Sequence, residues 1–292
     1  MANLPADVVA RSNAKSRRLR ELVRDPKILV MPGAYDALSA RLFEQLGFPA
    51  IQGTSGGIAA SHGLYDEELL GRDGTAALYR EMAAAVSVPV NADGEKGYGG
   101  PEMMAETVRA FVEVGAAGMN LEDSDYHAHG SPMRLVPWER QVEKIQAVME
   151  AKRQLGSEFF LNARVDAFGT VESHAQGMDE VIRRGNAYAE AGADCIFIFR
   201  PGDRDCIRTL VQEIHAPLSI LAVETSPPVP VLQELGVARV SYGSSFARFA
   251  ITAVQQMAEA LLNQGDIAPL MRTSMPRADY LQLLSGPFVQ RA

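Results

Sequence analysis

The feature that most constrains the fold of this chain is a regular alternation of short apolar runs with longer segments of helical spacing. The apolar runs lie at residues 28–31, 50–52, 88–92, 118–121, 159–163, 195–199, 218–222 and around Val240. The helical segments follow them at residues 35–46, 68–85, 101–114, 138–153, 178–191, 203–214, 229–235 and 246–262. Strands joined through helices lie parallel, because each helix carries the chain back to the end where the previous strand began. The pattern therefore predicts an α/β fold with a parallel sheet.

The chain length decides how such a sheet closes. A (β/α)8 barrel takes about 250 residues, and this chain has 292. A doubly wound open sheet is the alternative, but residues 31–35 hold one glycine where that fold has its Gly-x-Gly-x-x-Gly turn. No shift in composition marks a domain boundary. We predict an N-terminal helix within residues 1–24, a single (β/α)8 TIM barrel over residues 25–264, and a C-terminal helical extension over residues 265–292.

Composition narrows the class of protein. Hydrophobic residues make up 47% of the chain, which is enough for a large core. The net charge of −8, without a basic run, argues against nucleic acid as a partner. The arginine-rich start lacks the apolar run of a signal peptide, and no segment is apolar for long enough to span a bilayer, so we expect no membrane partner and a solvated basic face. Two cysteines fit neither a zinc motif nor a disulfide framework, and this predicts a reducing, cytoplasmic setting.

Polar residues gather directly after the predicted strands, where the chemistry of such barrels takes place. Acidic residues follow the first, third and fourth strands, and their oxygens suit a hard cation such as Mg²⁺. A small-residue loop after the second strand can bind an anion through its amides, and an arginine after the fifth can bind a carboxylate in a bidentate fork. Two alternatives remain open, namely an internal Arg164–Asp166 pair and a helix-capping role for Glu122. The residues concerned are Tyr35, Asp36, Ser55, Gly56, Gly57, Asp93, Glu95, Glu122 and Arg164.

Several ordered motifs resemble the isocitrate lyase / phosphoenolpyruvate mutase superfamily. They are residues 32–40 (PGAYDALSA), 55–57 (SGG), 91–99 (NADGEKGYG), 121–124 (LEDS), 162–167 (NARVDA) and 237–243 (VARVSYG). The matches keep their order and cover nearly the whole predicted barrel. The resemblance is closest to the branch of phosphonomutases, oxaloacetate decarboxylases and 2-methylisocitrate lyase-like proteins.

The resemblance implies a set of site residues. Tyr35, Ser55, Gly56 and Gly57 would bind the carboxylate of an oxo acid, with Asp36 beside the metal and the substrate. It further implies Mg²⁺, with Mn²⁺ as a substitute, and a cytoplasmic homotetramer acting on a small carboxylate. The metal ligands would be Asp93, Glu95 and Glu122, and Arg164 would hold the substrate.

Three departures from the family pattern matter. Many members have Asp-Ala-Asp at the third strand, where this chain has Asn91, and Glu95 looks like a replacement carboxylate. The Lys-Lys/Arg-Cys-Gly-His loop of the isocitrate and methylisocitrate lyases is absent from residues 125–134. Phe199 and Arg200 stand where several members have a glutamate. In that altered loop, His127 and His129 are candidate proton shuttles if the loop closes over the site.

These observations predict a Mg²⁺-dependent carbon–carbon lyase or decarboxylase. Its substrate would be a small 2-oxo or malate-type acid, which reacts through an enolpyruvate-like intermediate stabilised by the metal. A phosphonopyruvate mutase or hydrolase would use the same site on a P–C bond. A barrel that binds an oxo acid without turnover is the third reading, because Asn91 and the missing cysteine weaken the catalytic set.

Overall fold

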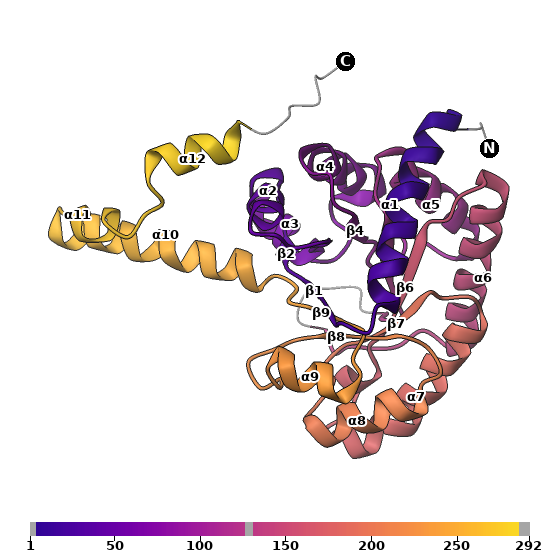
Figure 1. Cartoon of the computed structure of the whole chain (residues 1–292). Helices are drawn as coiled ribbons and strands as arrows, with labels where there is room; N and C mark the ends of the chain where they lie inside the picture. Colours follow the sequence, from indigo (N-terminus) through magenta and orange to yellow (C-terminus); the bar gives the residue numbers. More distant parts are fainter. Residues whose placement is uncertain (1–3, 126–130, 286–292) are drawn as a thin grey trace.

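The computed structural model describes residues 4–125 and 131–285, which form a barrel of parallel strands surrounded by helices (Figure 1). The described strands follow the order β1-β9-β8-β7-β6-β5-β4-β3-β2. They are β1 (Leu29–Met31), β2 (Gly33–Ala34), β3 (Ile51–Gly53), β4 (Val90–Asp93), β5 (Gly118–Glu122), β6 (Phe160–Val165), β7 (Cys195–Ile198), β8 (Leu218–Leu221) and β9 (Arg239–Ser241). β1 pairs with β9 and β2 with β3, so Pro32, which has no N–H, divides one barrel strand in two. The predicted barrel is confirmed.

The helices alternate with these strands, as the periodicity predicted. They are α1 (Ala6–Arg24), α2 (Ala37–Gln45), α3 (Ser55–Ser61), α4 (Gly71–Ala85), α5 (Met104–Glu113), α6 (Trp138–Leu155), α7 (His174–Glu190), α8 (Arg204–Glu213), α9 (Val229–Leu235), α10 (Ser245–Gln264), α11 (Ala268–Met271) and α12 (Arg277–Leu284), with the 3-10 turns η1 (Pro101–Met103) and η2 (Ala167–Thr170). Within the described residues, no helix is both long enough and apolar enough to cross a membrane.

Two helix starts differ from the prediction for local reasons. The helix predicted from residue 178 begins at His174, because Ser173 and Gln176 form a reciprocal capping box there. The Ser-Gly-Gly segment, predicted to be a loop, is the first turn of α3, and Thr54 caps it by accepting a hydrogen bond from the Gly57 amide. A cap residue thus outweighs the low helix propensity of two glycines.

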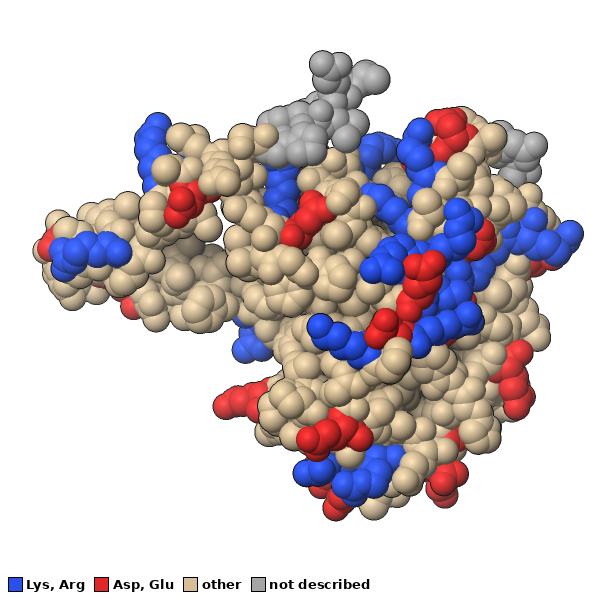
Figure 2. Space-filling view, in the orientation of Figure 1, with Lys and Arg blue, Asp and Glu red and all other residues tan. Residues whose placement is uncertain are grey.

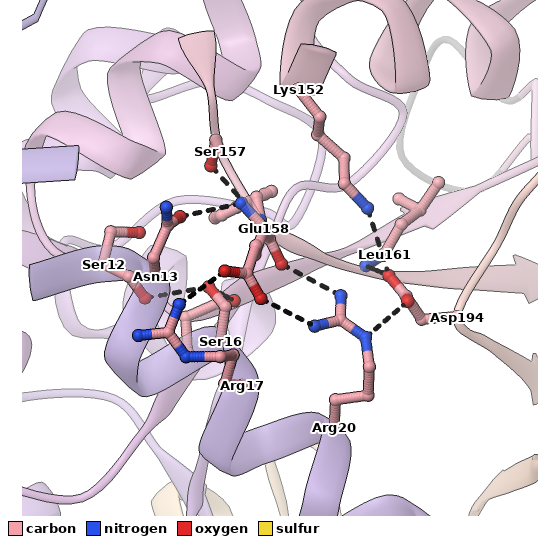
Figure 3. A network of polar contacts seen from close by, with 12 residues as sticks. Ser12, Asn13, Ser16, Arg17, Arg20, Lys152, Ser157, Glu158, Leu161 and Asp194 are labelled. Carbon is pink, nitrogen blue, oxygen red and sulfur yellow. Dashed lines mark hydrogen bonds and ion pairs between the residues drawn. The ribbon is translucent and has the colours of Figure 1, made fainter. Parts of the chain in front are cut away.

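Helix α1 closes the N-terminal end of the barrel. Leu19 and Val23 are buried against β1 and against Phe160 of β6. Beside this contact, Arg20 donates to a side-chain oxygen of Asp194 at 2.9 Å and to the carbonyl of Glu158 at 2.9 Å (Figure 3). The basic face of α1 is therefore not merely solvated: part of it fastens the helix to the barrel.

A layer of buried amide side chains fills the barrel interior above this apolar contact. Asn91 on β4 donates to Gln52 Oε1 at 2.9 Å and to Asn120 Oδ1 at 3.0 Å. Asn162 donates to the same oxygen of Asn120 at 2.8 Å. We call Gln52, Asn91, Asn120 and Asn162 the amide layer. Because side chains two apart on a strand point the same way, Asp93 lies one level nearer the C-terminal end than Asn91 does.

The chain leaves the barrel after β9 as an arm, which we define as residues 245–284 (Figure 1). At its base, Phe246 packs edge-on against Phe43 of α2, with the ring centres 4.8 Å apart. None of the residues of α10 is buried, although the helix is largely apolar. The arm carries few charged groups on the face that Figure 2 shows. Its exposed apolar side chains include Phe249, Ile251, Val254, Leu261 and Leu262.

Candidate active site

Asp93 ends β4 at the C-terminal mouth of the barrel and contacts the neighbouring strand end. Ser55, which follows β3, donates its hydroxyl to Asp93 Oδ2 at 3.0 Å. The backbone N–H of Asp93 donates to the hydroxyl of Tyr79 on α4 at 2.8 Å, which fixes the position of the turn. Burial raises the pKa of Asp93 against the opposing attraction of Arg164. The structure thus brings two predicted residues, Ser55 and Asp93, into contact.

Glu95 lies two residues beyond Asp93 and is also buried, at 7% exposure. Its Oε2 accepts the backbone N–H of Glu68 at 2.6 Å, and the Tyr98 hydroxyl donates to its Oε1 at 3.4 Å. Burial, followed by repulsion from Asp66 and Asp93, raises the pKa of Glu95 to about 9. Glu95 is therefore protonated at neutral pH when no cation lies beside it.

Glu122 and Arg164, at the ends of β5 and β6, form a buried ion pair. Arg164 Nη1 lies 2.7 Å from Glu122 Oε2, and Ser124 donates to the other carboxylate oxygen at 2.7 Å. Arg164 also donates through Nε and Nη2 to Asp166 Oδ1, at 3.1 and 2.7 Å. Burial raises the pKa of Asp166 to about 8, although Arg164 acts in the other direction. Arg164 therefore forms the internal pair with Asp166 and at the same time contacts Glu122 at the mouth of the barrel.

Asp123, which follows β5, connects the ends of β5 and β6 to helix α7. Its Oδ2 accepts hydrogen bonds from Arg184 at 2.8 Å and from the Tyr188 hydroxyl at 2.7 Å, both on α7. Its Oδ1 accepts the backbone N–H of Asp166 at 2.8 Å. These contacts tie the ends of β5 and β6 to an outer helix, so the Glu122–Arg164 pair stands on a rigid support.

The other predicted residues lie nearby with different contacts. Asp36 is exposed and caps α2, because its Oδ1 accepts the Ser39 N–H at 2.6 Å. Tyr35 is half-buried, and its Cβ lies 2.9 Å from where a Cβ on Gly57 would be. That contact explains why position 57 holds a glycine. His127 and His129 lie outside the described residues.

Asp66 belongs to the same carboxylate cluster, although the strand-end rule missed it. It retains an exposed face, yet loss of water around its carboxyl group and repulsion from Asp93 raise its pKa to about 7. Asp66 follows the short helix α3 rather than a strand, so the rule that site residues follow strands did not predict it. The acidic run at residues 66–68 was the available signal.

The carboxylates at the mouth of the barrel suit a divalent cation in their chemistry. The donors are carboxylates, which Mg²⁺ prefers, and several have pKa values raised by burial and mutual repulsion. A cation placed among them would relieve that repulsion, so the donor chemistry fits. Among the described residues, however, no three acidic, histidine or cysteine side chains already lie close enough together to hold an ion. Glu122 and Glu95 would have to exchange their present partners for the metal.

Comparison with known proteins identifies the family. Residues 19–262 match the family model described as phosphoenolpyruvate phosphomutase. The 2,3-dimethylmalate lyase of Eubacterium barkeri is 32% identical over 276 residues, which span 91% of this chain and 93% of that protein.

Solved structures agree with this assignment. A phosphoenolpyruvate phosphomutase from Streptomyces platensis subsp. rosaceus superposes with a TM-score of 0.83 at 29% identity, covering 92% of this chain and 94% of the other. An oxaloacetate acetylhydrolase bound to the inhibitor 3,3-difluorooxalacetate also has a TM-score of 0.83, at 27% identity and 92% coverage of both chains. The chain therefore belongs to the phosphoenolpyruvate mutase / isocitrate lyase superfamily and is an enzyme of its lyase and phosphomutase group.

Proposed function

We propose that this enzyme is a Mg²⁺-dependent carbon–carbon lyase or decarboxylase for a small 2-oxo or malate-type acid. The observation that carries the proposal is the grouping of Asp93, Glu95 and Glu122 with Ser55 and Arg164 at the C-terminal ends of neighbouring strands. The relatives named as dimethylmalate lyase and oxaloacetate acetylhydrolase support the same class of substrate.

Each residue has a part in this proposal. Asp93, Glu95 and Glu122 hold the ion, and the amides at Gly56 and Gly57 bind the oxo-acid carboxylate together with Ser55. When bound, Mg²⁺ would stabilise the negative charge that develops on the substrate oxygens. Arg164 binds the substrate while Asp166 holds its guanidinium in place.

The bond changes balance without a further reactant. In decarboxylation of a 3-carboxylated oxo acid, the C3–C4 bond breaks, carbon dioxide leaves, and the electron pair enters the enolate of the remaining oxo acid. Water or an acidic group then returns one proton to C3. In a malate-type cleavage, a base removes the C2 hydroxyl proton, the C2–C3 bond breaks, and C3 takes up a proton. Asp66, which is not among the proposed metal ligands and has a pKa of about 7, is the candidate proton carrier.

The two cysteines provide no thiol acid for this chemistry. Cys195 is buried on β7, and burial raises its pKa to about 12. Cys206 is buried on α8, where burial raises its pKa to about 11. This favours small oxo acids and substituted malates over isocitrate or methylisocitrate as substrates.

Phosphoryl chemistry at the same site is the second candidate. The matching family model carries the phosphomutase description over most of the chain. A phosphonate group would find a cation at the mouth in Arg200, which is exposed. The reaction would then break or move a P–C bond of phosphonopyruvate.

A substrate panel with Mg²⁺ tests the proposal. It comprises oxaloacetate, 2,3-dimethylmalate, 2-methylisocitrate and phosphonopyruvate. Formation of pyruvate or another oxo acid from a carbon–carbon substrate is the expected result. Phosphate release or rearrangement of phosphonopyruvate, without carbon–carbon cleavage, would establish the second candidate instead.

We further propose that the enzyme works as a homo-oligomer, with a tetramer expected from the family resemblance. The support is the arm, in which no residue of α10 is buried and apolar side chains such as Phe249, Ile251 and Leu262 are exposed. Such a helix in water would expose a larger apolar face than monomers usually present. A second copy of the chain presents the same apolar surface and so can cover it.

A further inference from the structure

The guanidinium groups of Arg164 and Arg200 both contact the aromatic ring of Phe199. The guanidinium carbon of Arg164 lies 4.6 Å from the centre of the Phe199 ring, and that of Arg200 lies 5.4 Å from the same centre. Both distances are within the range of a cation–π contact. Because both distances run to one ring centre, the two guanidinium carbons lie no more than about 10 Å apart, although Arg200 is exposed.

The backbone at Arg200 is held in an unusual conformation. Its φ angle is 54°, in the left-handed region that non-glycine residues seldom adopt. The carbonyl oxygen of Arg200 lies 2.9 Å from His174 Nε2, which must carry the proton because a carbonyl can only accept. The His174 ring packs edge-on against Phe168, with centres 4.6 Å apart. Strain kept by such supports is typical of functional positions.

The two arginines differ in how their charge is balanced. Arg164 faces two carboxylates, those of Glu122 and Asp166, and therefore carries no surplus positive charge. None of the described residues forms an ion pair with Arg200; its guanidinium contacts the Phe199 ring, and its backbone carbonyl accepts from His174. The charge of Arg200 is thus not balanced by a carboxylate of the described residues, and its planar guanidinium suits binding of a carboxylate.

We propose that Arg200 is a specificity-determining residue that binds a second anionic group of the substrate, namely the distal carboxylate of a dicarboxylic acid. This inference rests on the proposed function, since it needs an oxo-acid carboxylate bound at Ser55, Gly56 and Gly57. Phe199 contacts the guanidinium of Arg200, and His174 holds the turn that carries it. A substrate without the distal carboxylate would leave Arg200 unused.

The test compares two ligands of the Mg²⁺-loaded enzyme by calorimetry. Oxalate occupies only the oxo-acid position, whereas 3,3-difluorooxaloacetate carries a distal carboxylate as well. Arg200→Gln should weaken binding of the difluoro acid by about 10- to 100-fold, as expected for one charge-assisted hydrogen bond, and leave oxalate within about twofold. Arg200→Lys should keep part of the affinity, because it retains the charge without the fork.

Arg204→Gln is the matched control. Arg204 is an exposed arginine four residues further on, which pairs with Glu234 at 3.6 Å, and its loss should change neither affinity. If oxalate binds and Arg200→Gln leaves the difluoro acid unaffected, the role of Arg200 is refuted and the proposed function stands. If neither ligand binds the wild-type enzyme with Mg²⁺, the proposed function fails, and the inference fails with it.

Discussion

Glu95 Oε2 accepts a hydrogen bond from the backbone N–H of Glu68 at 2.6 Å, and the Glu68 carboxylate accepts in return from the Tyr98 N–H at 2.7 Å. All three residues have positive φ angles, of 45°, 57° and 59° for Glu95, Glu68 and Tyr98. The reciprocal contact offsets that backbone strain and ties the loop after α3 to the loop after β4. The carboxylate that is proposed to bind the metal therefore also holds a neighbouring loop.

Replacing Glu95 should separate these two roles. Glu95→Gln keeps an oxygen that can accept the Glu68 N–H, so its free energy of unfolding without metal should stay close to that of the wild type. Glu95→Ala leaves the half-buried N–H of Glu68 without its partner and should cost about 1 kcal/mol. Both variants should bind Mg²⁺ more weakly, as measured by calorimetry. Equal stability losses in the two variants would contradict the contact with Glu68.

The stability of the metal-free protein should fall as the pH rises. Glu95, Asp166 and Asp66 have pKa values of about 9, 8 and 7 in the folded protein, against ordinary values of 4.5, 3.8 and 3.8. Between the ordinary and the raised values, the folded state holds protons that the unfolded state has released, so unfolding becomes more favourable with increasing pH. The window runs from about pH 5 to about pH 9.

Thermal unfolding at several pH values, with EDTA or with Mg²⁺, measures this effect. Mg²⁺ should flatten the slope, because the ion favours the ionised carboxylates. Glu95→Gln should flatten it in EDTA. A melting temperature that rises between pH 5.5 and pH 8.5 in EDTA would show that these carboxyl groups are not protonated in the folded state.

Asp93→Asn should reduce Mg²⁺-dependent turnover by about 100-fold or more, since the neutral amide cannot balance the ion. The amide can still accept from the Ser55 hydroxyl, so the fold should survive. Asp179→Asn, which changes an exposed carboxylate on α7, is the control and should leave the rate unchanged. Full activity in Asp93→Asn would remove Asp93 from the metal site.

Asn91→Asp tests whether a carboxylate is missing at the third predicted strand. The side-chain nitrogen of Asn91 serves Gln52 and Asn120 within the amide layer, and an aspartate would replace two hydrogen bonds by contacts between acceptors. The variant should lose about 1–3 kcal/mol of stability without binding Mg²⁺ more tightly. Tighter Mg²⁺ binding would mean that position 91 reaches the ion after all.

Much of this architecture could be predicted because it rests on periodicity. Buried strands read as apolar runs, and parallel order places their C-terminal ends together, so Asp93, Glu122 and Arg164 could be grouped in advance. The amide layer could not be predicted. Asn91, Asn120 and Asn162 are polar residues within strands, and only the folded sheet brings the side-chain nitrogens of Asn91 and Asn162 to the side-chain oxygen of Asn120.

The hydrogen-bond partners of the site residues could not be predicted from the sequence either. Nothing in residues 91–100 indicates that Glu95 accepts the amide of Glu68, because the contact joins loops that follow different elements. Asp66 escaped notice because the chain inserts α3 between β3 and the acidic run. The capping role of Asp36 was visible in principle, since Ser39 stands three residues later, at the spacing of a capping box.

The arm yields the last prediction, which concerns assembly. Phe249 and Leu262 on α10 are 77% and 84% exposed, so charges placed there should not disturb the barrel. The Phe249→Glu/Leu262→Glu double variant should shift the enzyme from an oligomer to a 31.6 kDa monomer in light scattering and keep its circular dichroism spectrum. Gln256→Glu, an exposed polar position on the same helix, is the control for added charge and should stay oligomeric. A wild-type enzyme that is monomeric at micromolar concentration, or a double variant that still assembles, would show that the arm is not the contact between copies.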